Sequence, residues 1–360
     1  MSGKKKVIVI GGGLGGLSAA ISLQQKGYNV DLYEQNHHLG GKLNRLEQDG
    51  FGFDLGPSIL TMPHIFETLF QQSGKQMSDY VPVQRLEHQW RSFFPDGNTL
   101  DLYEDLQDME NLNPSLTKKD IKQYKKLLEY SKGLYEITEQ GYFNQGLDNL
   151  KEVLQYHGAF QSLRKFDLSS TMFDAIDKRI KNPQFRDMLS YIVKYVGSSA
   201  YHAPAVLNMM IYMQHAQGIW YVPGGMHNLA NALVKLAEEI GVTFHLGKKI
   251  VKLDKNKRVI TAAYTDDGMK LTADYFVSNM EVIPTYKQLT EEKESYTDKL
   301  DKKFEPASSG LVLHLGVKNS YPQLAHHNFF FSNNMKKQMN LIFEKHQLPD
   351  DPVIYLVNVN

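Results

Sequence analysis

The sequence of 360 residues contains no cysteine. Disulfide bonds, catalysis by a thiolate and zinc sites with cysteine ligands are therefore excluded. The chain also has no net charge, because 40 lysine and arginine residues balance 40 aspartate and glutamate residues. No overall field attracts nucleic acid, so an anionic partner such as a membrane surface would have to meet a local basic patch.

Long apolar stretches are also missing. No run approaches the roughly 20 apolar residues that a membrane-spanning helix requires. Only six residues, Met1 to Lys6, precede the first apolar run, which leaves no room for a signal peptide. We therefore expect a cytoplasmic protein, either soluble or peripheral on the inner face of the cell membrane.

The motifs of side-chain catalysis are absent as well. The sequence has no G-x-S-x-G, no H-E-x-x-H and no Walker A lysine. Two adjacent histidine pairs occur, His37-His38 and His326-His327, but neighbouring side chains point in opposite directions, so we expect no metal site. These absences favour a reaction carried by a bound cofactor.

The sequence does contain the pattern of a dinucleotide-binding unit. Val7–Ile10 are four β-branched apolar residues and predict a strand buried on both faces. Residues 17–25 predict a helix, residues 28–33 predict a second strand, and Glu34 follows it. Between the first strand and the helix lies a glycine-rich turn with the spacing G-x-G-x-x-G, formed by Gly11, Gly12, Gly13, Leu14, Gly15 and Gly16.

Each part of this pattern has a physical task. Gly11 permits the tight turn, Gly13 lets the backbone approach a pyrophosphate, and Gly16 lets the helix pack closely on the strand. The helix N-terminus offers free N–H groups and the positive end of the helix dipole. Glu34 lies near the roughly 20-residue offset at which a carboxylate binds the adenosine ribose. An acid there disfavours a 2′-phosphate, so the pattern favours FAD or NAD over NADP.

A second glycine pair follows. Gly40-Gly41-Lys42 and Arg45 suit the far side of a pyrophosphate, and an ordinary loop is an equal alternative. Residues 49–58 are rich in glycine and aromatic residues and predict a rigid, turn-rich segment.

Further along, the chain predicts hairpins at 90–103 and 258–277, an alternating strand at 311–317 and a further apolar strand at 353–359. Thr117 and Asp120 form a capping box at the start of an amphipathic helix with a lysine-rich face. Such a face binds anionic lipid in some proteins and is merely solvated in most, and we favour the second interpretation. Another helix starts near Met226 and ends at Gly241.

Several of these stretches together resemble the bacterial carotenoid desaturase and oxidase family of flavoproteins. They are the glycine-rich turn, Glu34, Gly40-Gly41-Lys42, and residues 54–58, 222–225 and 273–279. The resemblance covers essentially the whole chain. It implies an α/β fold of the glutathione reductase and amine oxidase type, with a Rossmann-like FAD-binding domain and a substrate domain of helices and a mixed sheet.

The resemblance also implies domains and site residues. Residues 1–58 and 215–285 would form the FAD-binding domain, and residues 59–214 and 286–360 the substrate and membrane-associated domain. The glycine-rich turn would contact the pyrophosphate of FAD and Glu34 the ribose. The second glycine pair would contribute Gly41 and Lys42, and Ile250 would offer a backbone contact to adenine.

One departure from the family is clear. The family closes with a glycine- and proline-rich segment along the flavin, and this C-terminal part is missing from the sequence. We therefore expect the 360-residue form to bind FAD weakly or not at all, and a chain that carries this segment to bind it.

The implied reaction is oxidation of the terminal methyl group of a C30 carotenoid polyene to an aldehyde, with FAD as redox centre and oxygen as co-reactant. A desaturase of the dehydrosqualene or phytoene type is an alternative, because it shares the cofactor motifs. A non-enzymatic prenyl-lipid carrier of the fold of GDP-dissociation inhibitors is another. An amine oxidase is less favoured, because no cysteine is available to link a flavin. The sequence names no catalytic residue.

Overall fold

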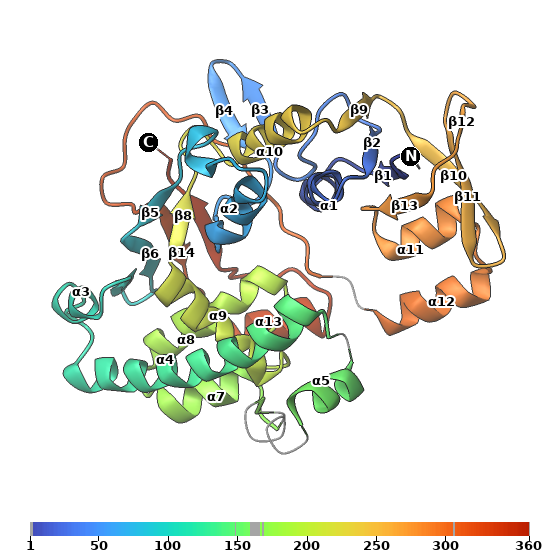
Figure 1. Ribbon diagram of the computed structural model, residues 1–360. Coiled ribbons are helices and arrows are strands. Elements are labelled where there is room, and N and C mark those ends of the chain that lie inside the picture. Colours follow the sequence, from blue (N-terminus) through green and yellow to red (C-terminus); the bar gives the residue numbers. More distant parts are fainter. Residues whose placement is uncertain (1–2, 148, 159–165, 168, 305–306, 360) are drawn as a thin grey trace. The chain divides into compact units, whose positions relative to one another are not determined.

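The computed structural model describes residues 3–147, 149–158, 166–167, 169–304 and 307–359 (Figure 1). The chain forms two compact units. The first unit contains residues 1–84 and 220–306, and the second contains residues 85–219 and 307–360. The boundaries between the units fall within β5 (Gln84–Leu86) and β8 (Ile219–Tyr221) and after residue 306. Each unit is therefore assembled from segments that are distant in sequence.

The first unit is built on a four-stranded parallel sheet with the strand order β13-β1-β2-β9. Helix α1 connects β1 to β2, and α10 packs beside it (Figure 1). The strand, helix and strand predicted from residue 7 to residue 34 are confirmed. The elements are β1 (Lys6–Ile10), α1 (Leu14–Gln25), β2 (Asn29–Glu34), α10 (His227–Glu239), β9 (Thr243–Leu246) and β13 (Tyr275–Ser278).

Both faces of this sheet are buried, which explains the run of four apolar residues in β1. Because side chains alternate along a strand, Val7 and Val9 face one side and Ile8 and Ile10 the other. The first pair belongs to a core with apolar residues of α1, α2 and α10. The second pair belongs to a core with residues of β10, β11 and β12. The predicted burial of β1 on both faces is therefore confirmed.

The other elements of the first unit surround this sheet. β3 and β4 form an antiparallel pair, and β10, β11 and β12 form an antiparallel sheet. The hairpin predicted at 258–277 is present only over β11 and β12, because residues 275–277 lie in β13 and pair with β1 instead. The bounds are β3 (Arg45–Gln48), β4 (Phe51–Asp54), α2 (Pro63–Gln71), β10 (Ile250–Asn256), β11 (Val259–Thr265), β12 (Lys270–Leu271), α11 (Val282–Pro284) and α12 (Glu294–Lys303).

The second unit contains a mixed sheet with the strand order β15-β14-β6-β7. β14 runs parallel to β6 and antiparallel to β15, and β6 and β7 form the hairpin predicted at 90–103. The Asp96-Gly97 turn closes this hairpin, and Gly97 has the positive φ of 86° that favours glycine. The strands are β6 (His88–Phe93), β7 (Thr99–Tyr103), β14 (His327–Phe330) and β15 (Ile354–Val357).

Helices make up most of the remainder of the second unit. The described ones are α3 (Leu106–Asn111), α4 (Lys118–Thr138), α5 (Leu150–His157), α7 (Met172–Arg179), α8 (Pro183–Ser190), α9 (Met209–Tyr212) and α13 (Met335–Phe343), with 3₁₀ helices at Tyr191–Val196 and Ala205–Asn208 and π-helical turns at Glu139–Phe143 and Met213–Gln217. Among the described residues, no helix combines the length and apolarity needed to cross a bilayer.

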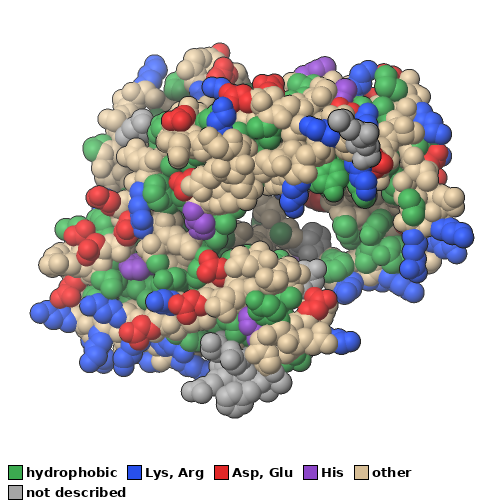
Figure 2. All heavy atoms as spheres, in the orientation of Figure 1, with side chains coloured by type: hydrophobic (Ala, Val, Ile, Leu, Met, Phe, Trp, Pro, Cys, Tyr) green, Lys and Arg blue, Asp and Glu red, His purple; other side chains and the backbone are tan. Residues whose placement is uncertain are grey.

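Helix α4 has the amphipathic form that its sequence predicts. Thr117 and Asp120 make the predicted capping box. The apolar side of the helix is buried, whereas its lysines are exposed, and basic side chains lie along α4 in Figure 2. That this face is solvated rather than bound to lipid stays a prediction. The exposed lysines are Lys118, Lys119, Lys122, Lys125 and Lys126.

The strand expected at residues 311–317 is wrong. These residues form no strand, and the exposed fraction of Leu311 reaches 93%. Apolar alternation predicts a strand only where a neighbouring strand supplies hydrogen bonds. No sheet of the described chain pairs with this segment. The strand expected at 353–359 forms, in shorter form, as β15.

His215 makes the second unit sensitive to acid. Burial, opposed by Asp105 and aided by Arg85, lowers the pKa of His215 from 6.5 to about 4. The unfolded chain therefore takes up a proton more readily than the folded chain, and stability is lost as the pH falls from about 6.5 to 4. A shift of this size corresponds to about 3 kcal/mol. We expect His215→Gln to reduce this loss, measured as the pH dependence of the urea midpoint.

Asp187 titrates in the same pH range, so the experiment must compare His215→Gln with wild type. Burial raises the pKa of Asp187 to about 6, so this carboxyl group gains stability from protonation over the same range. Because wild type and His215→Gln both contain Asp187, the difference between their pH profiles isolates His215. Parallel profiles for the two proteins would contradict the prediction.

Candidate functional site

The turn between β1 and α1 leaves the start of the helix open. Gly11 has a φ of 94°, which favours glycine, and its N–H donates to the Tyr33 carbonyl oxygen at 2.8 Å. Helix α1 begins after Gly13, and no side chain caps it. The first turn of the helix also carries no acidic residue. Its free N–H groups and positive dipole end therefore form an anion-binding position.

Close packing explains the third glycine of the motif. A Cβ atom on Gly16 would overlap the Gly11 carbonyl oxygen. A Cβ atom on Gly15 would overlap the Asn279 side chain. The sequence predicts that Gly16 lets the helix approach the strand, and the structure shows that approach. No larger residue fits at this position without moving the backbone.

Glu34 ends β2 with its carboxylate at the glycine-rich turn. Its side chain is buried, and Oε2 accepts from the Gly12 N–H at 2.7 Å. Oε1 accepts from the N–H and the side-chain amide of Asn36 at 2.9 and 2.8 Å. The carboxylate is thus held in place beside the open helix start. It is the acid that the offset of about 20 residues predicts.

The second glycine pair lies directly against the first turn. The Gly40 N–H donates to the Gly12 carbonyl oxygen at 2.8 Å, and Gly13 and Gly40 form a parallel bridge. A Cβ atom on Gly41 would lie 2.9 Å from the Gly13 Cα. Lys42 follows and is exposed. The structure therefore places Gly41 beside the glycine-rich turn, and contact of Gly41 and Lys42 with a pyrophosphate stays a prediction.

Ile250 follows a segment that is bonded to the end of β2. The Gly247 N–H donates to the Asn36 carbonyl oxygen, and the Lys248 N–H donates to the Glu34 carbonyl oxygen. Two residues later, Ile250 begins β10 and packs in the core that contains Tyr33. The chain from 247 to 250 thus runs beside the end of β2, near Glu34.

Sequence reasoning did not assign Asn279 to this site. Asn279 follows β13, and its N–H donates to the Ile10 carbonyl oxygen at 2.8 Å. Its Cβ is the nearest neighbour of a Cβ placed on Gly11. The signal was available, because a polar residue at the carboxyl end of a parallel strand beside β1 must lie at the same sheet edge as the glycine turn.

Asp54 and Arg45 fix a further glycine-rich segment in the first unit. Asp54 Oδ2 accepts from the Met226 N–H at 2.8 Å, at the start of α10. Arg45 Nη1 donates to the Gly224 carbonyl oxygen at 2.5 Å. The segment expected to be rigid at 49–58 therefore supports the turn that precedes α10.

We expect Asp54→Ala to destabilise the first unit by about 1 kcal/mol, because the start of α10 loses its carboxylate acceptor. Asp54→Asn retains an acceptor oxygen and should therefore lose less stability than Asp54→Ala. Thermal unfolding of the three proteins measures the effect. Equal melting temperatures for Ala and wild type would show that Asp54 has no capping role.

This site fits a dinucleotide. The uncapped start of α1 offers N–H donors to phosphate, a Cβ atom would overlap a neighbour at Gly12, Gly15 and Gly16, and Glu34 provides an acceptor for ribose hydroxyl groups. The parallel sheet, the turn and the acid define a dinucleotide-binding protein of the Rossmann type.

The family follows from comparison with known proteins. Residues 14–332 match the family described as flavin containing amine oxidoreductase, and the chain belongs to this family. The protein is an FAD-dependent oxidoreductase. The resemblance inferred from the motifs is confirmed, as is the expected α/β fold.

One relative supports this assignment, and two solved structures share the fold. The chain is 57% identical over 356 residues to the 4,4′-diaponeurosporene oxygenase of Staphylococcus aureus, covering 99% of this chain and 72% of the relative. An oxidoreductase from Methanosarcina mazei has a similar fold, with a TM-score of 0.58 and 17% identity over 84% of this chain and 66% of that one. The Rab GDI of Plasmodium falciparum has a TM-score of 0.55 and 14% identity over 99% of this chain and 79% of that one.

Proposed function

We propose that this protein oxidises the terminal methyl group of a C30 carotenoid, 4,4′-diaponeurosporene, to an aldehyde. The proposal depends on the 57% identity to the staphylococcal oxygenase over nearly the whole chain. In the balanced reaction, R–CH3 and O2 yield R–CHO and H2O, so the methyl carbon loses four electrons and oxygen gains four. A conjugated polyene stabilises charge or an unpaired electron at the methyl carbon attached to it.

The first unit would hold the cofactor. The turn of Gly11, Gly12, Gly13, Leu14, Gly15 and Gly16 would bind the pyrophosphate. Its donors would be the N–H groups at the start of α1, because the Gly11 and Gly12 N–H groups already donate to Tyr33 and Glu34. Glu34 would bind the adenosine ribose, Gly41 and Lys42 would meet the pyrophosphate from the other side, and the Ile250 backbone would contact adenine. FAD supplies the redox chemistry when bound.

The second unit would hold the polyene. Its mixed sheet and helices enclose many aromatic side chains, including Phe329 in contact with both Trp90 and Tyr191. Aromatic faces suit a flat conjugated chain. So apolar a substrate would be delivered from a membrane surface, for which the exposed lysines of α4 are the candidate contact.

Product analysis tests the proposal. Purified protein supplied with FAD, oxygen and 4,4′-diaponeurosporene is expected to form a product that contains one carbonyl oxygen, detected by mass spectrometry. A product with additional double bonds and no oxygen would identify a desaturase. Bound lipid with no flavin and no turnover would identify a carrier.

A further inference from the structure

A cluster of buried polar groups lies between the mixed sheet of the second unit and the 3₁₀ helix Tyr191–Val196. Phe329 of β14 is in register with Ser92 of β6. Because side chains alternate, His327 lies on the same face as Phe329, and Trp90 on the same face as Ser92. All four side chains are buried, and the rings of Trp90 and Phe329 are 4.9 Å apart.

Lys194 of the 3₁₀ helix covers this face. Its Nζ lies 4.2 Å from the ring centroid of Trp90 and 4.9 Å from that of Phe329. The Tyr195 ring is 3.9 Å away. The amine is thus enclosed by aromatic rings, and burial lowers the pKa of Lys194 well below its ordinary value. The amine can therefore be neutral in the folded protein.

Within the described chain, four polar atoms of this cluster are buried without a hydrogen-bond partner: Lys194 Nζ, His327 Nε2, Trp90 Nε1 and Ser92 Oγ. Buried polar atoms are normally paired, so several unpaired atoms in one place indicate a missing partner. Each of the four groups can donate. His327 Nδ1 lies 2.9 Å from the Tyr355 hydroxyl, and when that hydroxyl donates, the proton of the imidazole is on Nε2.

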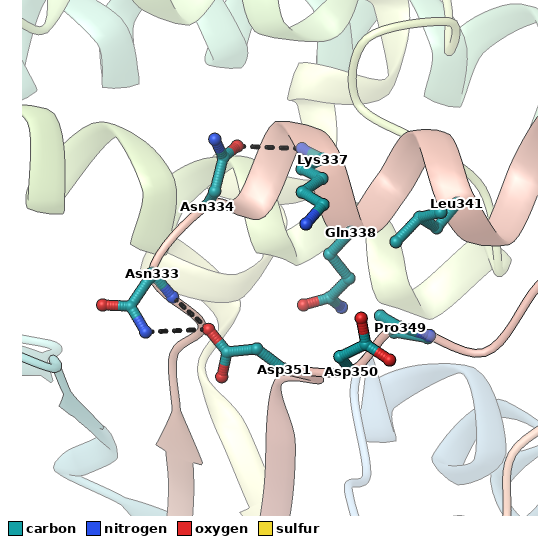
Figure 3. Close-up of a pocket in the computed structure, with 8 residues that line it drawn as sticks. All are labelled: Asn333, Asn334, Lys337, Gln338, Leu341, Pro349, Asp350 and Asp351. Atoms are coloured by element: carbon teal, nitrogen blue, oxygen red, sulfur yellow. Dashed lines mark hydrogen bonds between the residues drawn. The ribbon is translucent and has the colours of Figure 1, made fainter.

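A second candidate for a binding site in the same unit does not contain such a group of unpaired polar atoms. The hollow in Figure 3 lies beside the start of α13. Asp351 Oδ2 already accepts from the N–H and the side-chain amide of Asn333, at 2.7 and 2.9 Å. Asn334 caps α13 by accepting from the Lys337 N–H at 2.9 Å. Its polar groups are therefore largely occupied by one another.

We propose that Trp90, Ser92, Lys194 and His327 form a buried-amine site that binds the carbonyl oxygen of a polyene aldehyde. The inference rests on the proposed function, because an aldehyde is the product of that reaction. A carbonyl oxygen only accepts hydrogen bonds, which matches a set of groups that can all donate. It is also uncharged, which matches a site where burial lowers the pKa of both Lys194 and His327. The aromatic rings around the amine supply the apolar surface for the polyene.

The experiment uses the full chain and all-trans-retinal as a polyene aldehyde probe. The chain contains two tryptophans, Trp90 and Trp220. In a Trp220→Phe background, the fluorescence of Trp90 reports binding at the site. We expect Lys194→Met to weaken retinal binding about tenfold, because the oxygen loses a donor. Binding of lycopene, a polyene without oxygen, should stay unchanged.

Stability provides a second readout. Replacing an unpaired buried amine with methionine should leave the melting temperature equal or raise it. A lower melting temperature with weaker binding of both probes would show that Lys194 is structural and would overturn the inference. Unchanged retinal binding in Lys194→Met would also overturn it. Ser92→Ala serves as a second variant if Lys194→Met does not fold, with the same expectation for the two probes.

The charge of the ligand is tested separately. All-trans-retinoic acid differs from retinal in bearing a carboxylate. If wild type binds the acid more tightly than the aldehyde, the site takes anions and the assignment to a carbonyl is wrong. Retinal binding needs neither FAD nor turnover, so it is independent of the proposed oxidation. Lys194-dependent retinal binding without oxidation of 4,4′-diaponeurosporene would overturn only the proposed function, and the reverse result would overturn only this site.

Discussion

Replacing Gly16 with alanine is expected to weaken FAD binding by at least about tenfold and to destabilise the first unit by about 3 kcal/mol. The added Cβ would overlap the Gly11 carbonyl oxygen, so the turn or the start of α1 must shift. That shift displaces the N–H groups proposed to bind the pyrophosphate. Flavin fluorescence measures the affinity, in titrations that saturate the wild type, and thermal unfolding measures the stability.

Gly133 provides the matched control. It also lies within a helix, α4, but a Cβ atom there would meet nothing within 4 Å. Gly133→Ala should therefore stabilise the protein by about 0.5–1 kcal/mol, because alanine favours helix over the unfolded chain, and should leave FAD affinity unchanged. If Gly16→Ala behaves like Gly133→Ala, the proposed phosphate cradle is wrong.

Asp101→Asn is expected to destabilise the second unit by about 2–3 kcal/mol. Both carboxylate oxygens of Asp101 accept from Arg91, each at 2.8 Å, and the Asp101 side chain is only 8% exposed. Removing one charge of a buried pair leaves the other without compensation. Breaking a fully buried ion pair costs about 3–5 kcal/mol. Arg91 is 27% exposed, so water screens its charge in part and the loss of stability should be smaller. Urea unfolding at pH 7 measures the difference.

The pH dependence of this difference is a further expectation. Burial alone would raise the pKa of Asp101, but Arg91 and His88 outweigh burial and lower the pKa to about 2. Asp101 therefore contributes stability above its unfolded pKa of 3.8, and that contribution is lost as the pH falls toward 2. Wild type and Asp101→Asn should become similar in this range. A constant difference down to pH 2 would contradict the assignment.

Glu136→Gln is the control for Asp101→Asn. Glu136 pairs with Lys132 on α4 at 3.7 Å, and both side chains are more than half exposed. Exposed pairs contribute little, because water screens them and both side chains keep their freedom. The substitution removes the same charge from the same unit and should leave the urea midpoint nearly unchanged.

Local patterns account for much of what the sequence predicts correctly. The glycine spacing after Val7–Ile10, the Asp96-Gly97 turn and the capping box of Thr117 each depend on backbone geometry within a few residues. The residue type alone predicts such geometry, since only glycine adopts positive φ freely and only a short polar side chain caps a helix well. The resemblance to a known family then predicted the fold and the cofactor for the whole chain, beyond these local patterns.

Residues 311–317 show where local pattern is insufficient. Their apolar alternation is that of a strand, but a strand needs a partner that supplies hydrogen bonds, and the described sheets provide none. The contact of Asp54 with Met226 is similarly invisible from spacing alone, because the two residues are 172 positions apart.

The sequence by itself determined the dinucleotide-binding unit, because three glycines, an open helix start and an acid at the proper offset suffice to specify it. Only the tertiary structure decided that Lys194, His327, Trp90 and Ser92 lie together in the second unit, with polar atoms that find no partner there. Burial and pairing depend on which distant segments pack together, and that choice is made by the whole core rather than by any one stretch of residues.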